Sequence, residues 1–187
     1  MIIEDISENA VARIARKISG AGTQVDSITR IMPLSEHGMR QRMDIQYVQA
    51  TPELKAELKT QSESNASDFI RFEDNYTSVV ALDGDKPIAL IVAKKRGLPE
   101  PLQAEQEAYI DIIEVQPAYQ RQGIGTALIE QVVAWARENQ VTQVRAWSEE
   151  IRIEALMLWN KLGFTFSQVD FQRGDEKRYG FYVARRL

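Results

Sequence analysis

The spacing of hydrophobic residues divides the first part of the chain into both helices and strands. Apolar residues recur at helical spacing from Glu4 to Ile18, and Gly20 follows them, so one amphipathic helix is expected there. The alternation over residues 43–50 predicts a strand. This strand should run into a helix, because Thr51 suits the N-cap position and Pro52 suits the first turn.

Two further strands are expected at residues 78–82 and 87–94. The segment between them, 83–86, contains an Asp-Gly step between two apolar runs, which is a strong hairpin signal. The two strands should therefore pair in an antiparallel manner. The stretch 96–106 holds Gly97 and two prolines, and it predicts an exposed loop.

The second half of the chain predicts strands and helices in alternation, closed by two strands. The expected elements are a strand at 109–115, a helix at 123–138, a strand at 141–147, a helix at 151–162, and strands at 164–171 and 179–185. The helix at 123–138 has its hydrophobic residues on one arc and polar residues opposite, so it should pack on a sheet. Since it connects two strands as a crossover, those strands should be parallel neighbours.

Composition narrows the class of protein. The chain has 187 residues with 44% hydrophobic and 27% charged residues, which is typical of one globular domain. A net charge of -4 gives no positive field for binding nucleic acid. Cysteine is absent, so neither a disulfide nor a thiolate metal site is expected. His37, the single histidine, lies among polar residues and is expected to be a solvated loop residue, with a catalytic role as the alternative. The N-terminus lacks the features of a signal peptide and no stretch is apolar enough to cross a membrane, which predicts a cytoplasmic protein.

One segment with two glycines lies between the strand at 109–115 and the helix at 123–138. Its sequence is Gln120-Arg121-Gln122-Gly123-Ile124-Gly125. At such a junction, backbone N–H groups and the positive end of the helix dipole can hold an anion such as a pyrophosphate. A dinucleotide fingerprint would need a third glycine, and a P-loop would need Gly-Lys-Ser/Thr. A tight turn without a ligand is the alternative.

The order of elements and two signatures resemble the GNAT superfamily of N-acetyltransferases. In the first signature, Gln120, Gly123 and Gly125 match the pattern Arg/Gln-x-x-Gly-x-Gly/Ala. The second runs from Ala155 to Phe164, with an alanine, an aromatic residue and a Gly-Phe pair at the spacing of the family. The resemblance extends over residues 43–187. Residues 1–42 are expected to form a helical extension packed on the same domain.

The resemblance implies an α/β fold: a twisted, mostly antiparallel sheet of six or seven strands with flanking helices and a central parallel pair that splays apart. It also implies an enzyme that moves the acetyl group of acetyl-CoA to a primary amine of a small molecule or protein, directly within a ternary complex. No metal, nucleic acid or membrane is implied, and a homodimer stays open. The implied coenzyme-binding residues are Ile113, Val115, Gln120, Arg121, Gln122, Gly123, Ile124, Gly125, Thr126 and Trp159.

The reaction would need a base, because only the neutral form of an amine attacks a thioester. The resemblance implies a carboxylate on or near the strand before the glycine segment, and this strand offers Asp111 and Glu114. Glu114 is the favoured base and Asp111 the alternative. Strict alternation would place Asp111 with Ile113 and Val115 and would place Glu114 on the other face. The resemblance implies a bulge in this strand, which would shift the alternation after it. Either carboxylate could instead be solvated or pair with a lysine or arginine.

Trp159 departs from the family pattern. It stands where a tyrosine usually protonates the departing thiolate, and an indole N–H has too high a pKa for this role. Trp159 is therefore expected to pack against the coenzyme or the core. The oxyanion is expected to bind the backbone N–H of Val115. A module that binds the coenzyme without catalysis is the alternative function.

Overall fold

The computed structural model describes residues 45–61 and 64–187. The predicted helix at 4–18, the extension to which it belongs and His37 lie outside the described residues. Among the residues described, no helix is long and apolar enough to cross a membrane.

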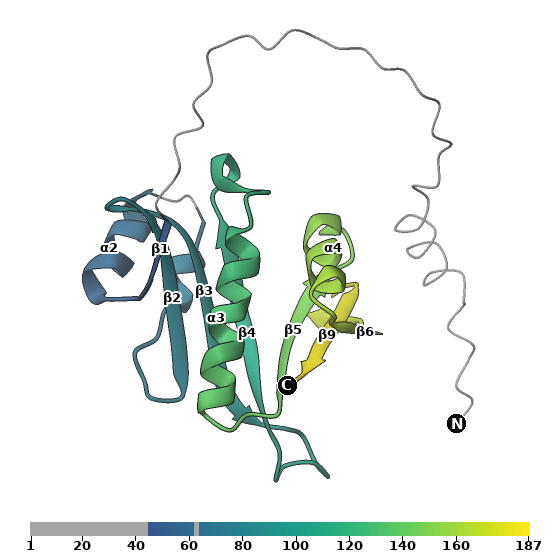
Figure 1. The fold of residues 1–187 in the computed structure, drawn as a ribbon. Helices are drawn as coiled ribbons and strands as arrows, with labels where there is room; N and C mark the ends of the chain where they lie inside the picture. Colours follow the sequence, from purple (N-terminus) through teal and green to yellow (C-terminus); the bar gives the residue numbers. More distant parts are fainter. Residues whose placement is uncertain (1–44, 62–63) are drawn as a thin grey trace, which may run out of the picture. The chain divides into compact units, whose positions relative to one another are not determined.

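Seven strands form one sheet in the spatial order β1-β2-β3-β4-β5-β9-β6 (Figure 1). They are β1 Ile45–Gln49, β2 Tyr76–Asp83, β3 Lys86–Gly97, β4 Gln106–Val115, β5 Gln143–Glu149, β6 Thr165–Gln168 and β9 Gly180–Arg186. The pair β4–β5 is parallel and the other neighbours are antiparallel. The predicted α/β fold with a parallel central pair is confirmed.

The described helices are α2 Pro52–Gln61, α3 Ile124–Glu138 and α4 Ile153–Lys161, with short 3-10 turns η1 Ala66–Phe69 and η2 Pro117–Tyr119. The N–H of Leu54 donates to Thr51 Oγ1 over 3.2 Å, so the predicted N-cap of α2 is confirmed. The hairpin β2–β3 also forms as predicted. Its turn contains Gly84 at φ +60°, a left-handed conformation that glycine adopts without steric cost.

The predicted strand at 164–171 is wrong, because the chain breaks it into two. β6 ends at Gln168, and β7 Phe171–Arg173 pairs instead with β8 Glu176–Arg178 in a separate two-stranded sheet. The Phe171 ring packs edge-on against Trp147 of β5, with 4.8 Å between ring centroids. Arg178 of β8 forms an ion pair with Glu149 of β5, with 2.7 Å between Nη1 and Oε1. These contacts with β5 hold the β7–β8 hairpin.

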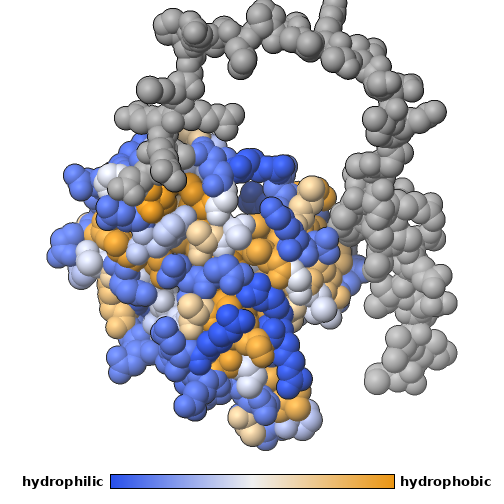
Figure 2. All heavy atoms as spheres, viewed as in Figure 1, coloured by the Kyte–Doolittle hydropathy of each residue, from blue (hydrophilic) through white to orange (hydrophobic). Residues whose placement is uncertain are grey.

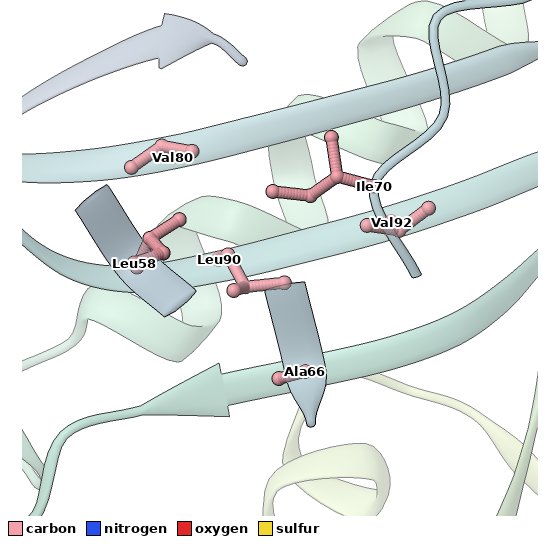
Figure 3. Packing of buried hydrophobic residues seen from close by; sticks show 6 residues of the cluster. All are labelled: Leu58, Ala66, Ile70, Val80, Leu90 and Val92. Atoms are coloured by element: carbon pink, nitrogen blue, oxygen red, sulfur yellow. The ribbon is translucent and has the colours of Figure 1, made fainter. Parts of the chain in front are cut away.

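The core lies on both faces of the sheet. On one face, α2 and η1 cover β2 and β3 with a buried cluster, while α3 passes behind the sheet in the same view (Figure 3). The cluster comprises Leu58, Ala66, Ile70, Val80, Leu90 and Val92. On the other face, α3 buries Leu128, Ile129, Val132, Val133 and Ala136 completely. Burial of each large aliphatic side chain contributes about 1.5–3 kcal/mol, so these contacts fix α3 against the sheet.

Candidate functional site

The parallel strands β4 and β5 pair over only part of their length. The Cα partners run from Glu107 with Gln143 to Ile110 with Ala146. Beyond this point, residues 111–115 of β4 and 147–149 of β5 have no partner across the junction. The two strands lie together at one end and apart at the other (Figure 1). The backbone groups of β4 that face this junction are therefore available beyond Ile110.

A β-bulge in β4 lies at Asp111. Ile110 pairs with Ala93 of β3 and Ile112 pairs with Val92, so Asp111 has no partner of its own in β3. Strict alternation therefore does not hold through this strand. After the bulge, Glu114 pairs with Leu90, which belongs to the cluster under α2. Glu114 is thus on the same face of the sheet as α2 and η1.

The two predicted carboxylates differ in their surroundings. Burial raises the pKa of Asp111 above that of an ordinary aspartate, while the nearby charges of Arg96, Lys94 and Arg71 act to lower it. Asp111 is half-buried and lies at the point where β4 leaves β5. Glu114 is also half-buried and lies one residue before the end of the strand.

The loop between β4 and α3 is held by side-chain amides. Gln120 Nε2 donates to the carbonyl oxygen of Val115 over 2.9 Å, and Gln116 Nε2 donates to that of Pro87 over 3.0 Å. The Tyr119 hydroxyl donates to Asp83 over 3.1 Å, and this bond raises the pKa of the phenol. The loop is consequently tied both to the end of β4 and to the β2–β3 hairpin.

Helix α3 begins directly after this loop. Gly123 precedes its first residue with φ +87°, and no atom lies within 4 Å of the position that a Cβ would take. Within the described part of the chain, no oxygen accepts a hydrogen bond from the N–H of Gly123, Ile124 or Gly125. A Cβ on Gly125 would lie 3.3 Å from Leu158 of α4 and 4.0 Å from Val115. The first turn of α3 therefore touches both the end of β4 and α4, with its positive dipole end exposed.

Of the predicted coenzyme-binding residues, the loop and β4 residues come together at this end of the sheet. Arg121 adopts φ +63°, and Arg121 and Gln122 are exposed, whereas Thr126 is half-buried in the first turn of α3. Trp159 is different: it is 3% exposed and packs edge-on against Phe164, with 4.8 Å between ring centroids. Trp159 thus belongs to the packing beneath α4.

A fully buried carboxylate, Glu107, lies at the second residue of β4 and was not among the predicted site residues. Arg96 of β3 binds it over 2.8 Å and Arg145 of β5 lies 3.2 Å from it. The strand predicted at residues 109–115 begins two residues after Glu107 and so does not include it. The signal that could have found it is the apolar continuation through Ala108, which extends the strand toward Glu107.

Comparison with known proteins agrees with this arrangement. The acetyltransferase (GNAT) family pattern matches residues 42–164. The chain belongs to this family. Membership makes the protein an acyltransferase, and the predicted family is confirmed. No curated protein matches the sequence.

Solved structures of GNAT acetyltransferases share the fold. Arabidopsis thaliana NAA60 in complex with acetyl-CoA has a TM-score of 0.63 and 16% identity, covering 76% of this chain and 98% of that one. The GNAT-family acetyltransferase of Streptococcus pneumoniae has a TM-score of 0.60 and 13% identity, covering 77% and 100%. The ribosomal-protein-S18-alanine N-acetyltransferase of Escherichia coli has a TM-score of 0.58 and 17% identity, covering 76% and 93%.

Proposed function

We propose that this GNAT enzyme transfers the acetyl group of acetyl-CoA directly to a primary amine within a ternary complex. The observation that supports the proposal is the exposed first turn of α3, with three N–H groups that no oxygen in the described chain accepts, beside the end of β4. These amides and the helix dipole suit a diphosphate. NAA60, which shares the fold, was solved with acetyl-CoA.

The chain offers a continuous surface for such a cosubstrate. The diphosphate would contact residues 120–126, and the arm that carries the thioester would lie along the part of β4 that β5 leaves unpaired, next to Ile113 and Val115. Backbone groups there can bind an extended arm as they would bind a strand. The Trp159 side chain would contribute to the packing of this region rather than to proton transfer.

The proposed chemistry is a direct acyl transfer. The neutral amine attacks the carbonyl carbon of the thioester, the C–S bond breaks, and the thiolate of CoA takes up a proton. A base accepts the proton that the amine nitrogen loses. The backbone N–H of Val115 is the proposed donor to the oxyanion. Because this chain contains no cysteine, none of its side chains offers a thiol that could carry the acetyl group.

Glu114 and Asp111 are the two candidates for the base. Burial raises the pKa of Asp111, which favours it, because a base with a pKa closer to neutrality binds the amine proton more strongly. Asp111 also lies where β4 leaves β5. Glu114 lies closer along the strand to Val115. Separate substitutions of the two carboxylates decide between them.

The test combines calorimetry with detection of free CoA thiol. The full chain is titrated with acetyl-CoA and then incubated with acetyl-CoA and a panel of amines, including peptides with free N-termini. Binding followed by amine-dependent release of CoA supports the proposal. Binding without release for any amine supports the alternative, a module that binds the coenzyme without catalysis. A chain that does not bind acetyl-CoA excludes both.

The cytoplasmic location and the extension at 1–42 stay predictions.

A further inference from the structure

Two arginines share one buried carboxylate on the face of the sheet that carries α2. Arg96 Nε donates to Glu107 Oε1 over 2.8 Å, and Arg145 Nε lies 3.2 Å from Oε2. Glu107 is 0% exposed, whereas the two arginine side chains are 38% and 20% exposed. Arg96 thus donates a hydrogen bond to Glu107 through Nε, whereas Arg145 Nε is within ion-pair distance of Glu107 but is a buried nitrogen without a hydrogen-bond partner among the described residues.

Aromatic rings fix the planes of both guanidinium groups. Arg96 stacks on Tyr109, with 3.7 Å from Cζ to the ring centroid, and Arg145 stacks on Tyr182 at 4.6 Å. Stacking of a guanidinium on an aromatic ring is favourable and restricts its rotation. Before any ligand binds, Arg96 is therefore restricted by a hydrogen bond and a ring, and Arg145 by an ion pair and a ring.

The terminal amino groups of these arginines are not used by the protein. Among the residues that the structure describes, no oxygen accepts a hydrogen bond from Nη1 or Nη2 of Arg96 or Arg145. Among the described residues, a fully buried nitrogen without a hydrogen-bond partner is found elsewhere but not at these four Nη atoms. The Nη atoms of Arg96 and Arg145 are therefore in contact with solvent. Two guanidinium groups against one carboxylate leave a net charge of +1. Such paired forks suit the oxygens of a carboxylate or phosphate.

This cluster of Arg96, Glu107 and Arg145 joins the first part of β4 to β3 and β5, and the part of β4 where the acetyl group is proposed to bind follows it along the same strand. Tyr76 packs on the core under α2. It pairs with Lys94 of β3, which in turn pairs with Tyr109 of β4. Paired residues of neighbouring strands lie on the same face of the sheet, so Tyr109 is on the face that α2 covers. Tyr109 precedes Asp111 by two residues, Ile113 by four and Val115 by six. At about 3.3 Å per residue, these separations are about 7 Å, 13 Å and 20 Å along the strand.

We propose that Arg96 and Arg145 bind an anionic group of the acceptor, a carboxylate or a phosphate, that lies about 7–20 Å from its reacting amine. The acceptor class is then an amine that also carries an anionic group. The part of the inference that concerns acetylation rests on the proposed function, whereas binding of the anion does not. The competing explanation is that the cluster only ties β3, β4 and β5 together.

Anion binding is tested first, without catalysis. The full chain is titrated with inorganic phosphate and with acetate, against chloride at equal ionic strength, while NMR follows the arginine Nε–Hε signals. Saturable shifts of the Arg96 and Arg145 signals are expected. Arg96→Lys and Arg145→Lys keep the charge but lose the fork, and should weaken binding about tenfold or more. Arg185→Gln is the matched control, because this arginine pairs with Glu130 of α3. Shifts that do not saturate, or that are equal in all variants, overturn the proposal.

Acetylation is tested second, with three amines of one length. They are 6-aminohexanoate, 6-aminohexyl phosphate and the neutral 6-amino-1-hexanol. At least one anionic amine should exceed the alcohol in kcat/KM by about tenfold or more, and either lysine variant should reduce this ratio, chiefly through KM. The anionic amine with the higher kcat/KM shows whether the site prefers a carboxylate or a phosphate. If kcat/KM for the alcohol equals that for both anionic amines, the inference is overturned and the proposed function stays intact. Saturable anion binding in a chain that does not bind acetyl-CoA overturns the proposed function and leaves the anion site intact.

Discussion

The side-chain amide of Gln120 donates a 2.9 Å hydrogen bond to the backbone carbonyl of Val115, and this bond joins the loop before α3 to the end of β4. Gln120→Ala removes the bond but leaves the exposed amides of α3 in place. Acetyl-CoA affinity should therefore fall by about threefold to tenfold, the effect of one ordinary hydrogen bond. Calorimetric titration measures it. Unchanged affinity would mean that the loop keeps its position without Gln120.

Gly123 allows a sharper test with two substitutions of nearly equal size. Asn and Asp both tolerate the left-handed conformation that Gly123 adopts at φ +87°, and no atom obstructs a Cβ there. Gly123→Asp puts a negative charge beside the α3 amides, whereas Gly123→Asn does not. The aspartate variant should lose acetyl-CoA binding, and the asparagine variant should retain measurably more. Equal affinities in two folded variants would place the diphosphate elsewhere.

The base should be revealed by substitutions that preserve shape and remove basicity. If Glu114 is the base, Glu114→Gln lowers kcat by about 10²- to 10⁴-fold with little change in acetyl-CoA affinity. If Asp111 is the base, Asp111→Asn shows this loss instead, and wild-type kcat falls as the pH drops through its raised pKa. Rates measured over a pH range distinguish the two. Full activity in both variants would exclude each carboxylate.

Asp111 should also affect how stability depends on pH. Burial raises its pKa in the folded state, so the folded chain binds this proton more tightly than the unfolded chain. This contribution to stability is present below the unfolded pKa of about 3.9 and is lost as the pH rises through the folded value. Asp111→Asn lacks it. The free energy of unfolding of the variant, relative to the wild type, should therefore increase from acidic to neutral pH. Denaturant titrations at several pH values measure the difference, and a decrease would contradict the raised pKa.

Trp159 should matter for stability more than for catalysis. It is 3% exposed and packs on Phe164, so Trp159→Tyr leaves a space and buries a hydroxyl, at a cost of about 1–3 kcal/mol in unfolding free energy. The rate of acetyl transfer in the folded variant should stay near that of the wild type. Met157→Ala is the control on the same helix, because Met157 is 47% exposed and should change stability by about 0.5 kcal/mol or less. A large loss of kcat in the tyrosine variant would contradict a packing role.

Local signals in the sequence predicted most of the fold correctly. The hairpin at Gly84, the N-cap at Thr51 and the end of α4 before Gly163 each depend on a few adjacent residues. The parallel pair followed from a helix that connects two strands. Hydrophilic residues cover much of the face in Figure 2 with hydrophobic residues between them, as expected for a domain of this composition.

Features that depend on contacts between distant residues could not be predicted. The break between β6 and β7 depends on Phe171 packing against Trp147, which no alternation along the strand reveals. A bulge in β4 was expected from the resemblance, but its position at Asp111 is a property of the pairing with β3. Glu107 is buried because Arg96 and Arg145 arrive from two other strands. The sequence therefore predicted a candidate site but not the orientation of the charged side chains around it.

The short parallel junction has a mechanical consequence. Four residue pairs join β4 to β5, so the sheet consists of two halves with a weak seam between them. A ligand arm lying in the unpaired part of this seam would act as an additional strand and connect the halves. Amide hydrogens of residues 143–146 should then exchange more slowly when acetyl-CoA is bound, and the melting temperature should rise with its concentration, because a ligand that binds only the folded chain stabilises it by mass action. Acetyl-CoA would then stabilise the folded enzyme by joining the two halves of the sheet, before its acetyl group reacts.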